Sequence, residues 1–207
     1  MIFGSSTSPT FTASYTGFVG GQTAVSLGFI PTFNVMTIPL PGSAQTVGSG
    51  TPVGTYAIVP SGLTSNNYGF TYSYGVLSVG AWTITGFYQP VDMTGALGYV
   101  INTVKGGSTV PLKFNIYAGT PGPLTERKSV SDVMFGAVQF AEYPCTQTPG
   151  FETPLEISNT GNTSLRYDTT GVQFIQNWQT PKVPNKCYQV RMTALDGSHI
   201  DAYFKTK

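Results

Sequence analysis

The chain has 207 residues, and its 10 basic and 9 acidic side chains leave a formal net charge of +1. Reading from Met1, the first charged side chain is Asp92, so all 19 charges lie in the last 116 residues. The lack of a basic cluster excludes a nucleic-acid site built on Lys and Arg, and the lack of a long apolar run excludes a membrane-spanning helix.

Glycine and proline punctuate the whole chain and favour strands over long helices. The 25 Gly and 15 Pro amount to nearly one in five residues. Residues 124–144 fit a helix and a strand equally well. Runs of β-forming residues, alternating clearly at 68–74, predict strands at 24–33, 55–59, 68–74, 76–79, 82–88, 110–117, 172–178, 187–195 and 199–205. Gly75 predicts a hairpin between the third and fourth of these strands, and Asp196-Gly197 predicts one between the last two.

The change in charge along the chain indicates a domain boundary at Val79-Gly80-Ala81. It divides the chain into residues 1–80 and 81–207, and both lengths suit independent β domains. Many short strands at near-regular spacing are typical of sandwiches. We expect an all-β protein of two tandem domains, a small β domain followed by an immunoglobulin-like β-sandwich.

Motifs in the first 80 residues resemble a known family. They are Ala13-Ser-Tyr-Thr-Gly-Phe-Val-Gly-Gly, then Thr51-Pro-Val-Gly-Thr-Tyr-Ala-Ile, and finally Asn67-Tyr-Gly-Phe-Thr-Tyr-Ser-Tyr before Gly75-Val-Leu-Ser-Val. This ordered set, over residues 11–80, is similar to the MBG-type β domain, a repeat unit of large bacterial surface proteins. One departure is Tyr74-Gly75, which stands where the family has Asn-Gly. The resemblance implies a non-catalytic β domain.

Residues 86–205 resemble a second family, the Pro-x-Lys-Phe domain. The motif that gives the family its name is carried by Pro111, Leu112, Lys113 and Phe114. The similarity continues through Cys145, the segment 165–168, and the stretch from Cys187 to His199. This resemblance implies a β-sandwich attached to extracellular multidomain proteins, with no catalytic activity.

Cys145 and Cys187 are the only cysteines, and two hypotheses apply to them. A disulfide between them would close a long loop, and the Pro-x-Lys-Phe resemblance supports it because that family carries a Cys near each position. It would imply an oxidising compartment. The alternative is a cysteine nucleophile paired with His199, which would also need an orienting base and an oxyanion site. Neither is indicated near these residues in the sequence.

Alternation in the segment 68–74 places Tyr68, Phe70, Tyr72 and Tyr74 on one strand face. Such a stripe is either part of a core or an exposed contact surface for a partner or a glycan. Interface cores are depleted in charge and enriched in aromatic residues, so the uncharged first domain is the expected contact surface. Its edges also lack the charges that normally prevent strand pairing.

These patterns lead to two hypotheses about function. The first is a structural or adhesive module on an outer surface, either a segment of a cell-surface protein or a virion protein such as a capsid decoration or tail component. Its partners would be other subunits or neighbouring domains. The second is a carbohydrate-binding module. The first 91 residues hold no acid, base, His or Cys, and no metal-ligand spacing is present, so we expect no enzyme, metal or cofactor.

Overall fold

The computed structural model describes residues 1–94, 99–122, 126–127, 138–146, 155–156 and 165–207. They form two compact units, Met1–Gly80 and Ala81–Lys207, which we call the N-terminal and C-terminal units. Both units are all-β, and their strands form three sheets. Among the described residues, no helix is long and apolar enough to cross a membrane.

The N-terminal unit is built on one antiparallel sheet of order β2-β1-β3-β4. Its strands are β1 (Thr32–Thr37), β2 (Ala44–Gln45), β3 (Gly54–Ser61) and β4 (Gly75–Val79). One face buries a small core of Val35, Tyr56, Leu77 and Val79, with Ile58 and Phe11 packed partly buried against it. In register, Tyr56 of β3 lies between Thr37 and Leu77, at the centre of the sheet.

The first residues of the chain run beside the end of β4. Ile2 and Gly80 form a parallel bridge. Phe3 N donates to Gly80 O at 3.0 Å, and Gly80 N donates to Met1 O at 2.9 Å. The two ends of the N-terminal unit therefore meet at one point.

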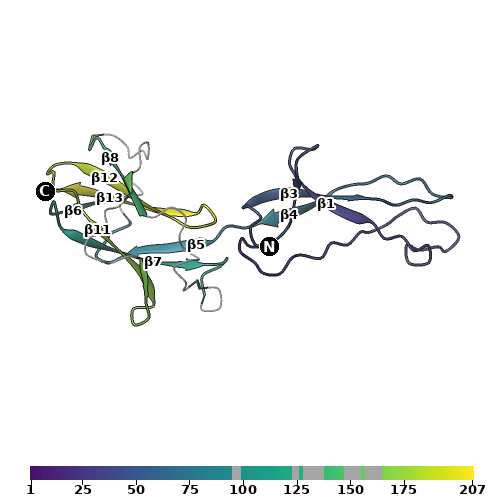
Figure 1. Ribbon diagram of the computed structural model, residues 1–207, viewed down its shortest axis with the longest axis horizontal. Coiled ribbons are helices and arrows are strands. Elements are labelled where there is room, and N and C mark those ends of the chain that lie inside the picture. The colour runs from purple at the N-terminus through teal and green to yellow at the C-terminus, as the bar shows by residue number, and fades with distance from the viewer. Residues whose placement is uncertain (95–98, 123–125, 128–137, 147–154, 157–164) are drawn as a thin grey trace. The chain divides into compact units, whose positions relative to one another are not determined.

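Two segments of the N-terminal unit extend beyond the sheet (Figure 1). The first arm, residues 8–31, leads into β1, and the second arm, residues 62–74, connects β3 to β4. The expected strand at 68–74 and the hairpin at Gly75 are wrong, because Gly75 is the first residue of β4 and pairs with Ile58. Alternation predicted an extended backbone here, but it carries no information about a partner strand.

The expected strand at 24–33 is also mostly wrong, since β1 begins only at Thr32. A hydrogen-bonded turn occupies the earlier part. Thr23 Oγ1 accepts from Ser26 N at 3.1 Å, and Leu27 N donates to Thr23 O at 3.1 Å. Gly28 follows with a φ of 65°, a backbone conformation that favours glycine. The hydroxyl-to-backbone bonds of Thr and Ser compete with strand pairing here.

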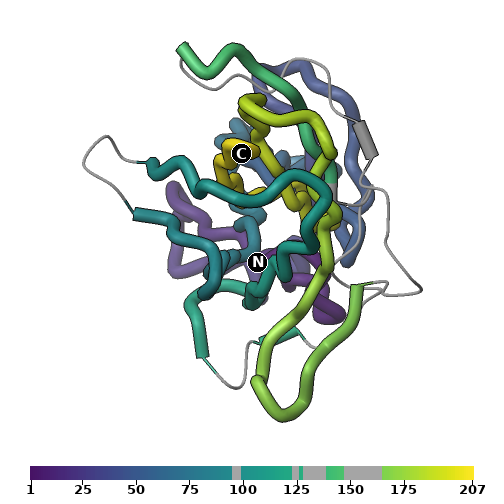
Figure 2. The backbone as a smooth tube through the Cα atoms, turned by 90° about the vertical axis from the view of Figure 1, so that its left-hand side faces the viewer, coloured from purple at the N-terminus to yellow at the C-terminus, as the bar shows by residue number. Residues whose placement is uncertain are grey.

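The C-terminal unit is a sandwich of two sheets. One has the order β10-β11-β7-β5 and the other β6-β13-β12-β8-β9. The strands of the first sheet are β5 (Thr83–Tyr88), β7 (Thr109–Tyr117), β10 (Arg166–Asp168) and β11 (Gln173–Gln179). The strands of the second are β6 (Ile101–Val104), β8 (Val138–Tyr143), β9 (Leu155–Glu156), β12 (Cys187–Thr193) and β13 (His199–Thr206). The hairpin of β10 and β11, yellow-green in Figure 2, projects from one end of its layer.

This strand order is that of an immunoglobulin constant domain. If β5, β7, β8, β10, β11, β12 and β13 are lettered A to G in chain order, one sheet contains A, B, E and D and the other contains C, F and G. Two strands are additional to this set: β6 pairs in parallel with β13, and β9 pairs antiparallel with β8. Of the segment 124–144, which fitted helix and strand equally, Val138–Tyr143 form β8, while residues 128–137 lie outside the described part of the chain.

Aromatic side chains join the two layers of the sandwich. Trp178 of β11 is fully buried, 4.8 Å from the ring of Phe204 on β13 and 6.2 Å from that of Tyr188 on β12. Within the first sheet, Phe114 stacks on Phe174 at 5.4 Å. The largest fully buried side chains of the described residues all belong to this unit. The hydrophobic stabilisation of the protein is therefore concentrated in residues 81–207.

Candidate functional site

The rings of the two arms gather into one cluster. Phe29 packs edge-to-face against Phe70 at 5.0 Å and against Tyr68 at 6.2 Å. Phe18 packs edge-to-face against Tyr68 at 5.7 Å. Ring contacts extend this group at both ends, and we define the aromatic cluster as Tyr15, Phe18, Phe29, Tyr68, Phe70 and Tyr72. These contacts hold the first arm beside the second.

Tyrosine hydroxyls of the cluster bind the backbone of the arms. Val19 N donates to the hydroxyl of Tyr68 at 3.4 Å, and this hydroxyl also bonds to the side chain of Gln22. Within the second arm, Leu63 N donates to the hydroxyl of Tyr72 at 3.0 Å. Side chains thus satisfy single backbone groups where no neighbouring strand does so.

A groove of about 750 Å³ runs along the cluster. Its walls are the two arms, and Phe33 and Ile58 of the sheet form part of its lining. Thr and Ser hydroxyls alternate with the rings along it, and no charged side chain lines it. The groove therefore offers apolar surface and neutral hydrogen-bonding groups, but no acid or base for chemistry.

The structure divides the predicted stripe of aromatic residues into two pairs. Tyr68 and Phe70 are half-buried in the cluster, whereas Tyr72 and Tyr74 are exposed. Sequence reasoning missed Phe18 and Phe29, the partners of this stripe on the first arm. Tyr15 and Phe18 belong to the motif that resembles the MBG-type domain, but nothing in that motif indicates where their rings pack.

The backbone of both arms is largely unpaired. In Met1–Gly80, all of which the structure describes, no backbone–backbone hydrogen bond involves residues 6–18 or 62–74. The N–H and C=O groups of an extended segment form strong hydrogen bonds when a partner strand is available. The arms therefore resemble an edge strand in having free backbone N–H and C=O groups, although they do not pair with any strand of the sheet.

Exposed apolar side chains also concentrate in this unit. Of the twelve large hydrophobic side chains most exposed among the described residues, nine lie in Met1–Gly80. Val25 and Ile30 of the first arm are 92% and 83% exposed. Large exposed apolar surfaces mark interaction sites in soluble proteins.

The motif of the Pro-x-Lys-Phe resemblance lies on β7, in the core of the C-terminal unit. Phe114 is fully buried, and Lys113 is half-buried one residue before it. Pro111 lies beyond Lys113, where the ladder between β5 and β7 has ended, so it has a neighbouring strand on one side only. Proline is tolerated at such edge positions. In this structure the motif packs and orients a strand.

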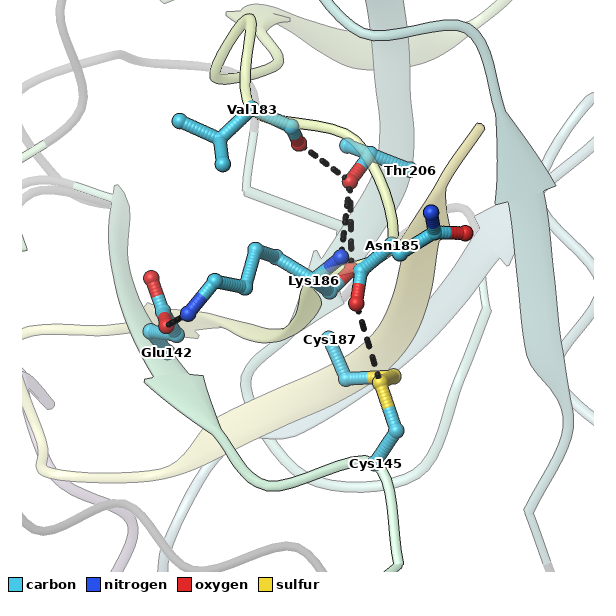
Figure 3. The surroundings of a disulfide bond; sticks show 7 residues. All are labelled: Glu142, Cys145, Val183, Asn185, Lys186, Cys187 and Thr206. Carbon is cyan, nitrogen blue, oxygen red and sulfur yellow. Dashed lines mark hydrogen bonds and ion pairs between the residues drawn. A yellow bond between two sulfur atoms is a disulfide. The ribbon is translucent and has the colours of Figure 1, made fainter.

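A disulfide joins Cys145 and Cys187, whose Cα atoms are 5.2 Å apart (Figure 3). Cys187 is fully buried at the start of β12, whereas Cys145 is exposed after β8. The carbonyl oxygen of Asn185 lies 3.8 Å from Cys145 Sγ. The disulfide therefore ties the end of β8 to the strand that pairs with it.

Polar contacts brace the segment beside this disulfide. Thr206 Oγ1 donates to Val183 O at 2.6 Å, and Lys186 N donates to Thr206 Oγ1 at 3.2 Å (Figure 3). Lys186 Nζ also forms an exposed ion pair with Glu142 at 2.6 Å. Surface pairs of this kind contribute little stability. The covalent bond is the dominant link here.

The alternative of a cysteine nucleophile is wrong for this structure. Cys187 is oxidised in the disulfide and pairs with Lys205, whereas His199 pairs with Thr193 at the other end of the same ladder. Six residue steps separate the two positions, which is about 20 Å at ~3.3 Å per residue. Within the described residues, no three His, Cys, Asp or Glu side chains are grouped as metal ligands would be.

Tyr143 gives a prediction about alkaline stability. Its side chain is 6% exposed, and burial, with smaller contributions from Tyr99 and Tyr203, raises its pKa from 10.0 to about 12. The unfolded chain then loses this proton at lower pH than the folded chain does. We therefore expect stability that is fully present below pH 10 to fall as the pH rises towards 12.

Tyr143→Phe tests this cause directly. Among the described residues, the Tyr143 hydroxyl has no hydrogen-bond partner, so we expect the variant to gain up to about 1 kcal/mol at neutral pH. The stability decline from pH 10 to 12 should also become shallower. Guanidinium unfolding at several pH values measures both effects, and Tyr74→Phe, at an exposed tyrosine, is the control. An unchanged slope would contradict the assignment.

The first part of the chain is similar to a known protein family. A family profile described as "MBG domain (YGX type)" matches residues 1–78, which confirms the resemblance expected for residues 11–80. None of the curated proteins compared matches the chain. The crystal structure of the S-layer protein SbsC domains 4 and 5 is 14% identical, covering 95% of this chain and 78% of that chain, with a TM-score of 0.28. A TM-score this low supports no argument about fold. The resemblance of residues 86–205 to the Pro-x-Lys-Phe domain stays a prediction.

Proposed function

We propose that this chain is a non-catalytic structural module displayed on the outer surface of a cell or virus particle. In this proposal the N-terminal unit makes the contacts to neighbouring proteins, and the C-terminal sandwich is the stable body that presents it. The protein would be extracellular and would need no cofactor.

One observation carries the proposal: among the described residues, most of the exposed large apolar side chains lie in the uncharged N-terminal unit. Nine of these twelve side chains belong to Met1–Gly80. This unit has no charged side chain, because the first one in the chain is Asp92. A domain free in water normally covers such a surface with charged groups. A surface that lacks them, beside unpaired backbone, fits a domain that is covered by another protein.

The disulfide supports an outer-surface location. Disulfides persist in oxidising environments and are rare in a reducing cytoplasm. Cys145 and Cys187 are the only two cysteines, and each is the other's partner. The family match of residues 1–78 also supports the proposal, because the MBG-type resemblance implies surface proteins built from such domains.

Lysine labelling of the intact source organism or particle tests the location. Every lysine lies in the C-terminal unit, and Lys182 and Lys186 are exposed. We expect a membrane-impermeant amine reagent to label both before any permeabilisation, while a cytoplasmic protein of the same sample stays unlabelled. Labelling that appears only after permeabilisation would contradict the proposal.

Carbohydrate binding is the second candidate, and the groove gives it some support through its hydroxyls and the exposed Tyr72 and Tyr74. Sugar stacking requires an open ring face. Phe29 instead packs edge-to-face against both Tyr68 and Phe70, so part of the ring surface in the cluster is already covered. The geometry therefore favours a protein partner, and glycan binding enters below as an outcome of the experiment.

A further inference from the structure

We infer that the two arms of the N-terminal unit are a strand-pairing site for the arms of a second copy of this chain. This inference deepens the contact role proposed above and names the partner. The pairing would be β-addition, in which backbone hydrogen bonds provide affinity and alternating side chains provide register.

The first step of the argument is that the N-terminal unit is incomplete by itself. Its buried core of large side chains is limited to Val35, Tyr56, Leu77 and Val79, within 80 residues. A domain of this size buries a smaller fraction of its chain's surface than a larger domain does, and its stability is correspondingly marginal. Burying the apolar side chains of the arms against a partner would therefore add to the stability of the N-terminal unit.

The second step concerns the backbone. Residues 6–18 and 62–74 make no backbone–backbone hydrogen bond in this fully described unit. Along both arms, half-buried side chains alternate with exposed ones, as in Phe11 to Thr16 and Tyr68 to Thr71. This is the side-chain pattern of a strand. The arms thus combine strand-like side chains with free hydrogen-bonding groups.

The third step identifies the occupant from charge. A partner strand must bring alternating apolar side chains and must place no ionised group in a groove that offers it no counter-charge. The arms of another copy meet both conditions, because no charged side chain occurs before Asp92. The edge strand β10 of the C-terminal unit does not meet the second condition, since it contains Arg166 and Asp168 within three residues.

Symmetry makes the pairing of identical arms self-consistent. Two copies related by a two-fold axis present the same surface to each other, so antiparallel pairing of an arm with its counterpart closes the assembly as a dimer. The arms present charge-free edges to this approach. They lack the charged residues that protect exposed edges from pairing.

The test uses the full chain, residues 1–207, in sedimentation experiments from about 1 to about 100 μM. We expect wild-type protein to dimerise. Ile30→Lys and Tyr74→Lys, at positions 83% and 56% exposed, should each weaken the dimer at least about tenfold, because each places an unpaired charge in the contact. Val183→Lys is the matched control, since it adds the same charge at an exposed valine of the C-terminal unit and should leave the dimer unchanged.

Hydrogen exchange distinguishes strand pairing from a contact made by side chains alone. The amides of residues 8–18 and 66–74 should exchange more slowly in the dimer than in the Tyr74→Lys monomer. A monomeric wild type, a dimer that the control weakens equally, or a dimer without this protection would each overturn the inference. Binding of a neutral glycan by a monomer, detected on a glycan array, would overturn it as well.

The two proposals fail separately. A protein that is labelled on intact cells or particles but stays monomeric would remove the pairing and keep the surface location. A protein that dimerises through the arms but is never labelled by the surface reagent would keep the pairing and remove the surface location.

Discussion

Trp178→Ala is expected to lower the free energy of unfolding of the C-terminal unit by about 3–5 kcal/mol. The indole of Trp178 is fully buried and contacts Phe204 at 4.8 Å and Tyr188 at 6.2 Å, both in the opposite sheet. Its removal leaves a cavity between two layers that pairing within each sheet holds in place, so the cavity collapses only partly.

Guanidinium unfolding followed by far-UV circular dichroism measures this loss. The control is Val183→Ala, a truncation at an exposed position, which should change stability by less than about 0.5 kcal/mol. A loss for Trp178→Ala as small as that of the control would show that the two sheets do not pack through this ring.

Breaking the disulfide is expected to cost about 2–4 kcal/mol. The bond closes a loop with a sequence separation of 42, and its loss restores conformational freedom mainly to the unfolded chain. Cys145→Ser is the preferred variant, because Cys145 is exposed and the buried Cys187 keeps its own packing.

Chemical unfolding of Cys145→Ser beside wild type measures the cost. Wild type treated with a reductant should approach the stability of the variant, while the variant itself should not respond to reductant. Equal stability of oxidised wild type and Cys145→Ser would contradict a stabilising role for the bond.

The strands of the C-terminal unit could be predicted well from the sequence. The ranges 110–117 and 172–178 correspond to β7 and β11, and Asp196-Gly197 joins β12 to β13 as expected. In β7 the alternate apolar residues Val110, Leu112, Phe114 and Ile116 are buried, so the periodicity of this strand reports its packing directly. The short strand β6 was missed, because its four residues pair in parallel with β13, and parallel pairing leaves no turn signal in the sequence.

The candidate site could be predicted only in its residue types. Composition identified the uncharged unit, and alternation identified Tyr68 and Phe70 as one stripe. The groove depends on how two arms approach each other through Phe18 and Phe29, which lie about 40 to 50 residues earlier in the chain. A local sequence pattern does not predict contacts between segments that lie so far apart in the chain. The turn at Thr23 and Ser26 was missed for a related reason, since the neighbouring β-forming residues concealed it.

The meeting of Met1 to Phe3 with the end of β4 has a mechanical consequence. Because Ile2 and Gly80 pair in parallel at a single point, tension applied between the two ends of the unit passes through this short pairing. The sheet and the arms lie outside the line of force. A pull along the chain would therefore load these few hydrogen bonds in shear, while the surface carried by the arms keeps its shape under stress.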